Sequence, residues 1–147
     1  MTTEIESIIG RLEKATGPDR EIDGEIEAAL GAPSFTRFDL AEGYHWEFEA
    51  DGMAGEVSAF SVLGNKTSRR QKRFQAPVYT ASVDAALTLL PEGFKWKLGY
   101  SRHVPCVAEL VDYSDRAAGQ FVGECDSNHA VALTLAALRA RLSQKAE

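Results

Sequence analysis

Five positive charges lie within eight residues near the middle of this chain. No acidic residue interrupts this basic segment, whose charged members are Lys66, Arg69, Arg70, Lys72 and Arg73. Guanidinium groups match the geometry of phosphate oxygens, and aromatic side chains stack on nucleobases. The sequence therefore predicts a site for a phosphate-bearing, nucleotide-like ligand. We expect its binding residues to be Arg69, Arg70, Lys72, Arg73, Tyr44 and Trp46.

A structural role for the same basic segment is the alternative interpretation. Gly64-Asn65 predicts that the segment begins as a loop. Residues 1–56 carry 14 acidic and 4 basic residues, so a solvated basic loop would balance this charge within one chain or across a homodimer. Aromatic residues on a strand are also common core residues. The residues alone leave both interpretations open.

Two histidines and two cysteines have spacings that superficially resemble a zinc site, with His103 before Cys106 and Cys125 before His129. Alternation along a strand argues against convergence, because His103 lies on the opposite face when Cys106 faces the core. We therefore expect two buried thiols, two surface imidazoles, and neither a metal site nor a cofactor. Two cysteines are too few for a disulfide framework and fit a reducing cytoplasm.

Catalytic motifs are absent from the sequence. There is no nucleophile elbow, no metalloprotease helix and no phosphate-binding glycine loop. A general-base mechanism would need one of three histidines or a carboxylate pair such as Glu47 and Glu49, which share one face of a predicted strand. Exposed carboxylates in this arrangement are common on strands. We expect no catalytic residues, and hydrolysis of a nucleotide is the less favoured alternative.

Length and composition limit the class of protein. The chain has 147 residues, a net charge of −6 and 44% hydrophobic residues, which is typical of a single globular domain. No run approaches the roughly 18 apolar residues of a membrane span, and the N-terminus lacks a secretion signal. Negative net charge argues against general nucleic-acid binding. The sequence therefore predicts one cytoplasmic domain over residues 1–147 that does not bind membranes.

Helical periodicity occurs in four segments. Apolar residues spaced three and four apart predict a helix over residues 3–15 and a second over 19–30, whose other faces are acidic. Ser82 is expected to cap a third helix that ends before Pro91. The last helix, 127–144, is expected to bury a single stripe. That stripe consists of Val131, Leu135, Leu138 and Leu142, with Ala130, Thr134 and Ala137 beside it.

Strand-like alternation occurs in two regions. Residues 44–49 and 56–63, separated by a turn at Asp51-Gly52, predict a β-hairpin within a variable insert at about 32–77. Three further short strands are expected to form an antiparallel meander, and they cover residues 95–100, 104–111 and 120–125. The expected fold class is α+β, with an antiparallel three-stranded sheet packed by helices in a layered sandwich. The hairpin forms an insert in this sandwich.

Three of these segments also carry a family resemblance. The stretches GPDREIDGEIEAALG, YTASVDAALTLLPEGFKW and AVALTLAALRAR resemble the phage alpha-beta-alpha sandwich domain family. The resemblance covers roughly residues 1–31 and 78–142, and it describes the insert least. This family is defined by fold rather than by an activity, so it brings no catalytic residues. It implies a phage-encoded accessory protein in the host bacterial cytoplasm.

These observations together favour a protein that acts by binding. The expected function is inhibition of host antiphage defence by sequestering a nucleotide-like signal molecule through the insert. The alternative is a protein-interaction module that blocks a host defence protein directly, through the aromatic insert or the acidic helix. The acidic residues of that helix are Glu21, Asp23, Glu25 and Glu27. A homodimer is also expected, because a small sheet leaves an edge to cover.

Overall fold

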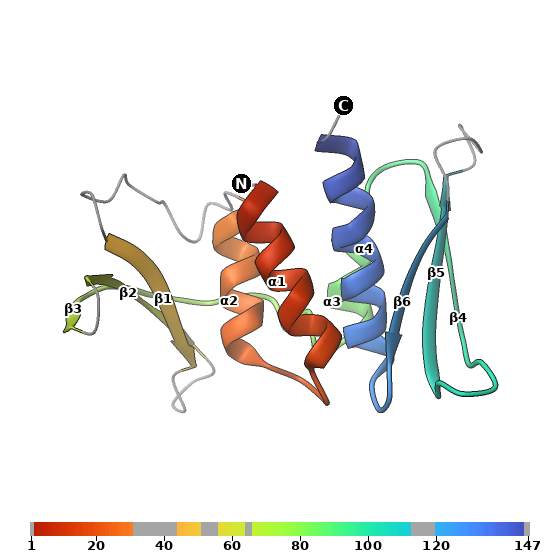
Figure 1. The fold of residues 1–147 in the computed structure, drawn as a ribbon, viewed down its shortest axis with the longest axis horizontal. Coiled ribbons are helices and arrows are strands. Elements are labelled where there is room, and N and C mark those ends of the chain that lie inside the picture. The colour runs from red at the N-terminus through yellow and green to blue at the C-terminus, as the bar shows by residue number, and fades with distance from the viewer. Residues whose placement is uncertain (1, 31–43, 51–55, 64–65, 113–119, 146–147) are drawn as a thin grey trace. The chain divides into compact units, whose positions relative to one another are not determined.

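The chain folds into two compact units, each built from helices and an antiparallel sheet. A computed structural model describes residues 2–30, 44–50, 56–63, 66–112 and 120–145, with the backbone alone at 2–3, 66–73, 112 and 145. Unit 1 comprises residues 1–19 and 78–147, and unit 2 comprises residues 20–77 (Figure 1). The fold class is α+β, with two three-stranded antiparallel sheets. The expected insert at 32–77 lies inside unit 2, which also includes the second helix.

The sheet of unit 1 follows the chain order. Strands β4 (Phe94–Gly99), β5 (Cys106–Asp112) and β6 (Gln120–Cys125) pair antiparallel with β5 in the centre. This arrangement confirms the predicted meander. Along the central strand, Cys106, Ala108 and Leu110 are buried, as the alternation indicated.

Helix α4 (His129–Lys145) is the core of unit 1. Every residue from 130 to 138 is buried, so the predicted single stripe of apolar residues was too narrow. The reason is that α4 contacts β5 and β6 as well as α1 (Thr2–Lys14) and α3 (Val83–Leu87). A helix enclosed in this way is apolar all round, and its many alanines permit close approach. No helix in the described part of the chain is long and apolar enough to cross a membrane.

Hydrogen bonds from polar side chains stabilise the elements around α4. Ser82 caps α3 as predicted, since its Oγ accepts a hydrogen bond from the Ala85 amide at 3.3 Å, although this helix ends at Leu87. Arg139 of α4 donates to the Val122 carbonyl of β6 at 2.5 Å and to Glu13 Oε2 of α1 at 3.0 Å. Because β6 is an edge strand, Arg139 satisfies one of its free carbonyls and ties α1 to it.

Unit 2 contains α2 (Arg20–Ala29) and the strands β1 (Tyr44–Ala50), β2 (Val57–Leu63) and β3 (Lys66–Phe74). The predicted antiparallel pairing of the first two strands is confirmed. The expectation that the basic segment is a loop is wrong, because its backbone pairs with β2 and makes the sheet three-stranded. The predicted turn at Asp51-Gly52 lies outside the described residues.

A small core joins α2 to the sheet of unit 2. It consists of Ala28, Val57, Ala59, Phe74 and Ala76, with Trp46 and Phe48 packed against it. Helix and sheet approach closely, since a Cβ on Gly24 would lie 2.5 Å from Val57 Cγ1. The rings of Phe48 and Phe74 meet edge to face with centroids 6.2 Å apart.

Arg20 joins the beginning and the end of unit 2. Its guanidinium lies 2.9 Å from Asp23 Oδ2 and donates to the Ala76 carbonyl at 2.8 Å. The Asp23 side chain is fully buried and Glu27 is also buried. The expectation that the acidic residues of this helix face solvent is therefore wrong for these two. A buried carboxylate needs a partner of opposite charge, which explains why an arginine begins the helix.

Gly123 sets the distance between β6 and α4, and this predicts a steric effect. A Cβ at Gly123 would lie 1.9 Å from the Ala132 carbonyl oxygen, so G123A must push the helix away from the sheet. We expect the free energy of unfolding to fall by about 3 kcal/mol in urea denaturation. G99A is the matched control, because no atom lies within 4 Å of its added Cβ. Equal stability of the two variants would contradict this packing.

The Arg20–Asp23 pair predicts a second loss of stability. D23A leaves the Arg20 charge without its buried carboxylate, and we expect unfolding to become easier by about 2 kcal/mol. E92A removes an acid from an exposed turn and serves as the control, with a change within about 0.5 kcal/mol. Indistinguishable thermal unfolding of D23A and E92A would show that the pair does not stabilise unit 2.

Candidate functional site

The two faces of the sheet in unit 2 differ in chemistry. Directly paired residues of antiparallel strands share a face, and neighbours along a strand alternate. On β1, one face carries the aromatic residues Tyr44, Trp46 and Phe48, which we call the aromatic face. The other carries His45, Glu47 and Glu49, which we call the acidic face. Each face continues onto β2 through the register.

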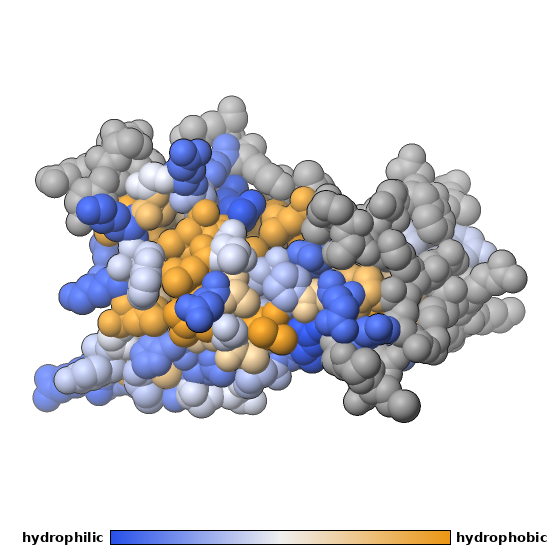
Figure 2. All heavy atoms as spheres, turned by 180° about the vertical axis from the view of Figure 1, so that it is seen from behind, coloured by the Kyte–Doolittle hydropathy of each residue, from blue (hydrophilic) through white to orange (hydrophobic). Residues whose placement is uncertain are grey.

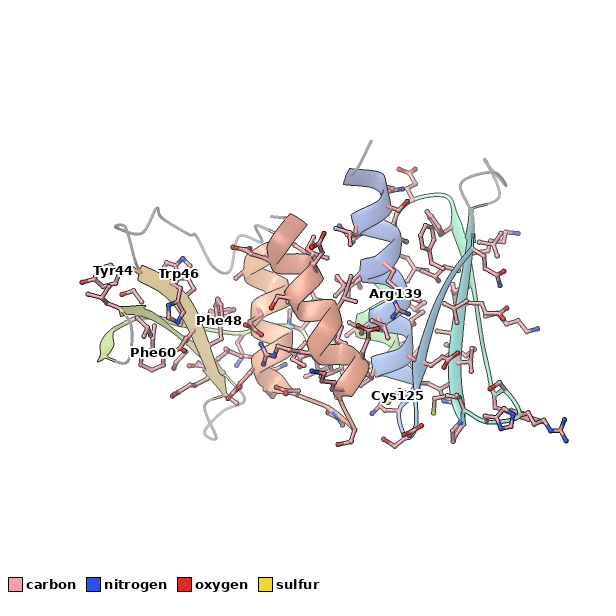
Figure 3. The ribbon with its side chains drawn as sticks, viewed as in Figure 1. Tyr44, Trp46, Phe48, Phe60, Cys125 and Arg139 are labelled. Carbon is pink, nitrogen blue, oxygen red and sulfur yellow. The ribbon has the colours of Figure 1, made fainter. Side chains whose placement is uncertain are left out.

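The aromatic face has a covered end and an open end. Phe48 pairs with Ala59 next to the core under α2, and Trp46 is half-buried against the same core. Tyr44 pairs with Leu63 at the other end, where the two residues are 37% and 43% exposed. Figure 3 shows Tyr44, Trp46 and Phe48 following one another along β1. The open end is the part that a planar ligand can reach.

The pairing of β2 with β3 is irregular, and it decides which basic residues join the aromatic face. Lys72 pairs directly with Ala59, the partner of Phe48. Further along, two residues of β3, Ser68 and Arg69, lie opposite the single residue Ser61, the partner of Trp46. Two residues opposite one is the definition of a β-bulge. We call a set of residues that pair directly across the three strands a row. Positions 69 and 72 therefore belong to rows of the aromatic face.

The other two predicted arginines fall in rows of the acidic face. Arg70 pairs with Phe60, whose partner on β1 is Glu47. Arg73 pairs with Ser58, whose partner on β1 is Glu49. The register thus divides the six residues expected to bind ligand. The rows of the aromatic face contain Tyr44, Trp46, Arg69 and Lys72. The rows of the acidic face contain Arg70 and Arg73.

Sequence reasoning also missed one member of the aromatic rows. Lys66 pairs with Leu63, the partner of Tyr44, and so lies in the row at the open end. It was counted in the basic segment but left out of the expected site. Reading the segment as a loop hid this position, because only a strand register assigns a residue to a face.

The acidic face presents carboxylates on an open surface. Glu47 and Glu49 are exposed, and His45 Nε2 lies 3.3 Å from Glu47 Oε1. General acid–base catalysis works best where carboxylates are shielded from water and their pKa values are tuned by their surroundings. These two acids lie instead in the rows of Arg70 and Arg73. This arrangement fits neutralisation across the sheet better than catalysis.

Two hollows in the described part of unit 1 are further candidate sites. One, of about 240 Å³, is lined by Glu13, Val122, Glu124, Leu135 and Arg139. The Arg139 guanidinium already donates hydrogen bonds to the Val122 carbonyl and to Glu13. The other, of about 370 Å³, is lined by the turn 100–105 alone. Neither hollow brings segments that are distant in the sequence together around free hydrogen-bond donors. The surface seen from behind mixes hydrophobic and hydrophilic residues (Figure 2).

The two cysteines lie together in unit 1. Cys106 pairs directly with Cys125, and both are buried free thiols, as predicted. Burial raises the pKa of the Cys106 thiol, and nearby Cys125 and Asp126 raise it further. His103 is exposed as expected, but His129 is half-buried with its Nε2 3.2 Å from the Gly99 carbonyl. Among the described residues, no three acidic, histidine or cysteine side chains form a metal site.

Comparisons with protein-family models, curated proteins and solved structures found no match to this chain. The chain is therefore assigned to no family here. The resemblance to phage sandwich domains rests on the three sequence stretches that carry it. Function must be argued from the two faces of the sheet in unit 2.

The raised pKa of Cys106 predicts a pH dependence of stability. A thiol whose pKa is higher in the folded than in the unfolded state stabilises the fold fully below the unfolded value. This contribution is lost as pH rises through the folded value. We expect the free energy of unfolding to decline above about pH 9, by at most about 1.4 kcal/mol per pH unit. C106A should show a shallower decline in urea titrations, and parallel curves would contradict the shift.

Proposed function

We propose that this chain acts by binding, and that the aromatic face of unit 2 holds a phosphate-bearing, nucleotide-like ligand. One observation carries the proposal: the register puts Lys66, Arg69 and Lys72 in the rows of three aromatic residues. No acidic residue of the three strands falls in those rows. Aromatic rings and cations in the same rows of a sheet are a combination that can recognise a base and its phosphates.

The energetics favour the open end of this face. Stacking of a base on an aromatic side chain contributes about 1–3 kcal/mol, and a hydrogen bond to a charged group about 1.5–3 kcal/mol. Tyr44 and Trp46 supply the stacking surface, with positions 66 and 69 in the same rows. On the opposite face, the rows of Arg70 and Arg73 contain Glu47 and Glu49, which would repel phosphate.

The biological role we propose follows from the resemblance to phage sandwich domains. The chain is a non-enzymatic accessory protein in the host bacterial cytoplasm, where it inhibits antiphage defence by sequestering a nucleotide signal. Unit 1 is then the layered sandwich, in which α4 separates the sheet from α1 and α3. Unit 2 contains the elaborated insert at about 32–77, and both units belong to one domain.

Direct blocking of a host defence protein is the alternative that we carry forward. The exposed pair Tyr44 and Leu63 favours it, since an apolar, aromatic patch also suits a protein partner. The acidic helix supports this alternative less, because Asp23 and Glu27 are buried. The two mechanisms differ in whether the purified protein carries or binds a small molecule. Turnover of an added nucleotide would favour the third candidate, a hydrolase.

Two matched double variants test the assignment of the ligand to one face. We expect K66Q/R69Q to weaken binding of a nucleotide at least 100-fold, because two phosphate contacts at the open end are lost. R70Q/R73Q removes the same charge from the same strand and should change affinity less than about fivefold. The probes are ATP and a cyclic dinucleotide, measured by calorimetry, with circular dichroism to verify folding. Native mass spectrometry of protein from phage-challenged cells would show which nucleotide co-purifies.

Equal losses in both variants would mean that net charge, and not the aromatic face, drives binding. Retained binding in K66Q/R69Q and W46A would place the ligand elsewhere. Protein that binds neither probe and co-purifies with no small molecule, yet still protects the phage, would refute sequestration and favour the protein-partner mechanism.

A further inference from the structure

The cysteines of unit 1 form the last rung of the ladder between β5 and β6. Strand β5 begins at Cys106, β6 ends at Cys125, and these two residues are direct partners in the register. Direct partners in an antiparallel pair have Cβ atoms about 4.5–5.5 Å apart. A disulfide needs about 3.5–4.5 Å. A terminal rung can close this difference, because no pairing beyond it holds the strands apart.

The surroundings of the pair connect it to the end of α1. Cys125 Sγ lies 3.8 Å from the Ala15 carbonyl, to which the thiol donates a hydrogen bond. Ser127 Oγ donates to the neighbouring Thr16 carbonyl. These two contacts hold the residues that follow α1 against the turn between β6 and α4, and Figure 3 shows Cys125 at that end of β6. Each cysteine is only about one-twentieth exposed, at 6% for Cys106 and 5% for Cys125.

We propose that Cys106 and Cys125 are a cross-strand dithiol that small-molecule disulfides oxidise to an intramolecular disulfide. One cysteine thiolate attacks a sulfur of the oxidant, which forms a mixed disulfide and releases one small thiol. The second cysteine thiolate then attacks the protein sulfur of that mixed disulfide. The Cys106–Cys125 bond forms and a second small thiol leaves. Two electrons pass to the oxidant, and the two cysteine protons end on the released thiols.

Oxidation has a structural consequence in unit 1. The disulfide lacks the S–H group of Cys125, so the hydrogen bond to the Ala15 carbonyl is lost. The contact from Ser127 to Thr16 remains as the single described side-chain hydrogen bond between this turn and the end of α1. The residues that follow α1 are therefore held less firmly in the oxidised state. Since the raised pKa of Cys106 keeps it protonated near neutral pH, the reaction is slow there.

The test treats the folded full-length chain with oxidised glutathione at about pH 9 and measures the intact mass. The expected product has lost two hydrogens and carries no glutathione, and its digest contains a peptide linking Cys106 to Cys125. C106S and C125S cannot form this product, so their expected masses are unchanged or increased by one glutathione. Hydrogen exchange of residues 12–17 should be faster in the oxidised protein than in the reduced protein.

Three results would overturn the proposal. Glutathione adducts without the internal bond would show that the thiols cannot meet in the folded chain. Cross-linking only in denaturant, or only between two chains, would lead to the same conclusion. Unchanged exchange at residues 12–17 in the oxidised protein would overturn the predicted loosening. The intact-mass result on the unmodified chain decides the main point even where a serine variant fails to fold.

Discussion

The pairing between β2 and β3 is the constraint on which the candidate site depends. Strands alternate their faces with a period of two, so a shift by one residue exchanges every side chain between faces. Here the register accommodates extra residues of β3 at bulges. Lys72, Arg69 and Lys66 thereby fall in the rows of Phe48, Trp46 and Tyr44. Without the bulges, Arg69 would lie opposite Val62, in the row of His45 on the acidic face.

The two units are stabilised by different interactions. Unit 1 is built around α4, which is buried along most of its length and contacts strands and helices on several sides. Unit 2 has a small core under α2 and relies on polar links such as Arg20 with Asp23 and the Ala76 carbonyl. A thin core leaves most residues of β1 exposed. Such a sheet can present a binding surface, whereas the apolar residues of unit 1 are used mainly in core packing.

Much of the fold follows from periodicity in the sequence. The antiparallel meander was predictable because Cys106, Ala108 and Leu110 alternate with more exposed residues. The enclosure of α4 was not, since the sequence shows the stripe of Val131, Leu135 and Leu138 but not the burial of Ala132 and Ala136 outside it. The burial of Asp23 was not predictable either, because it depends on how the helix packs and on the ion pair with Arg20, whose own side chain is 23% exposed. Local sequence does not carry that information.

The candidate site was predictable in composition but not in arrangement. Charge and aromaticity singled out Tyr44, Trp46 and the basic segment. A segment with five cations in eight residues reads as a loop because no apolar alternation is visible in it. Its strand character comes from backbone pairing with β2, which is a tertiary effect. The division of the arginines between two faces depends on bulges, and bulges have no reliable signature in a single sequence.

The most direct test of this account is the register itself, measured by NMR on the isotopically labelled full-length chain. The account predicts cross-strand contacts between the backbones of Ala59 and Lys72 and of Phe60 and Arg70, with Gln71 between them unpaired. It also predicts that Ser61 lies opposite both Ser68 and Arg69. An even register without bulges, in which Phe60 pairs with Gln71 and Ser61 with Arg70, would contradict it. Arg69 would then leave the row of Trp46 and Arg70 would take its place, which would reverse the assignment of these two arginines to the faces.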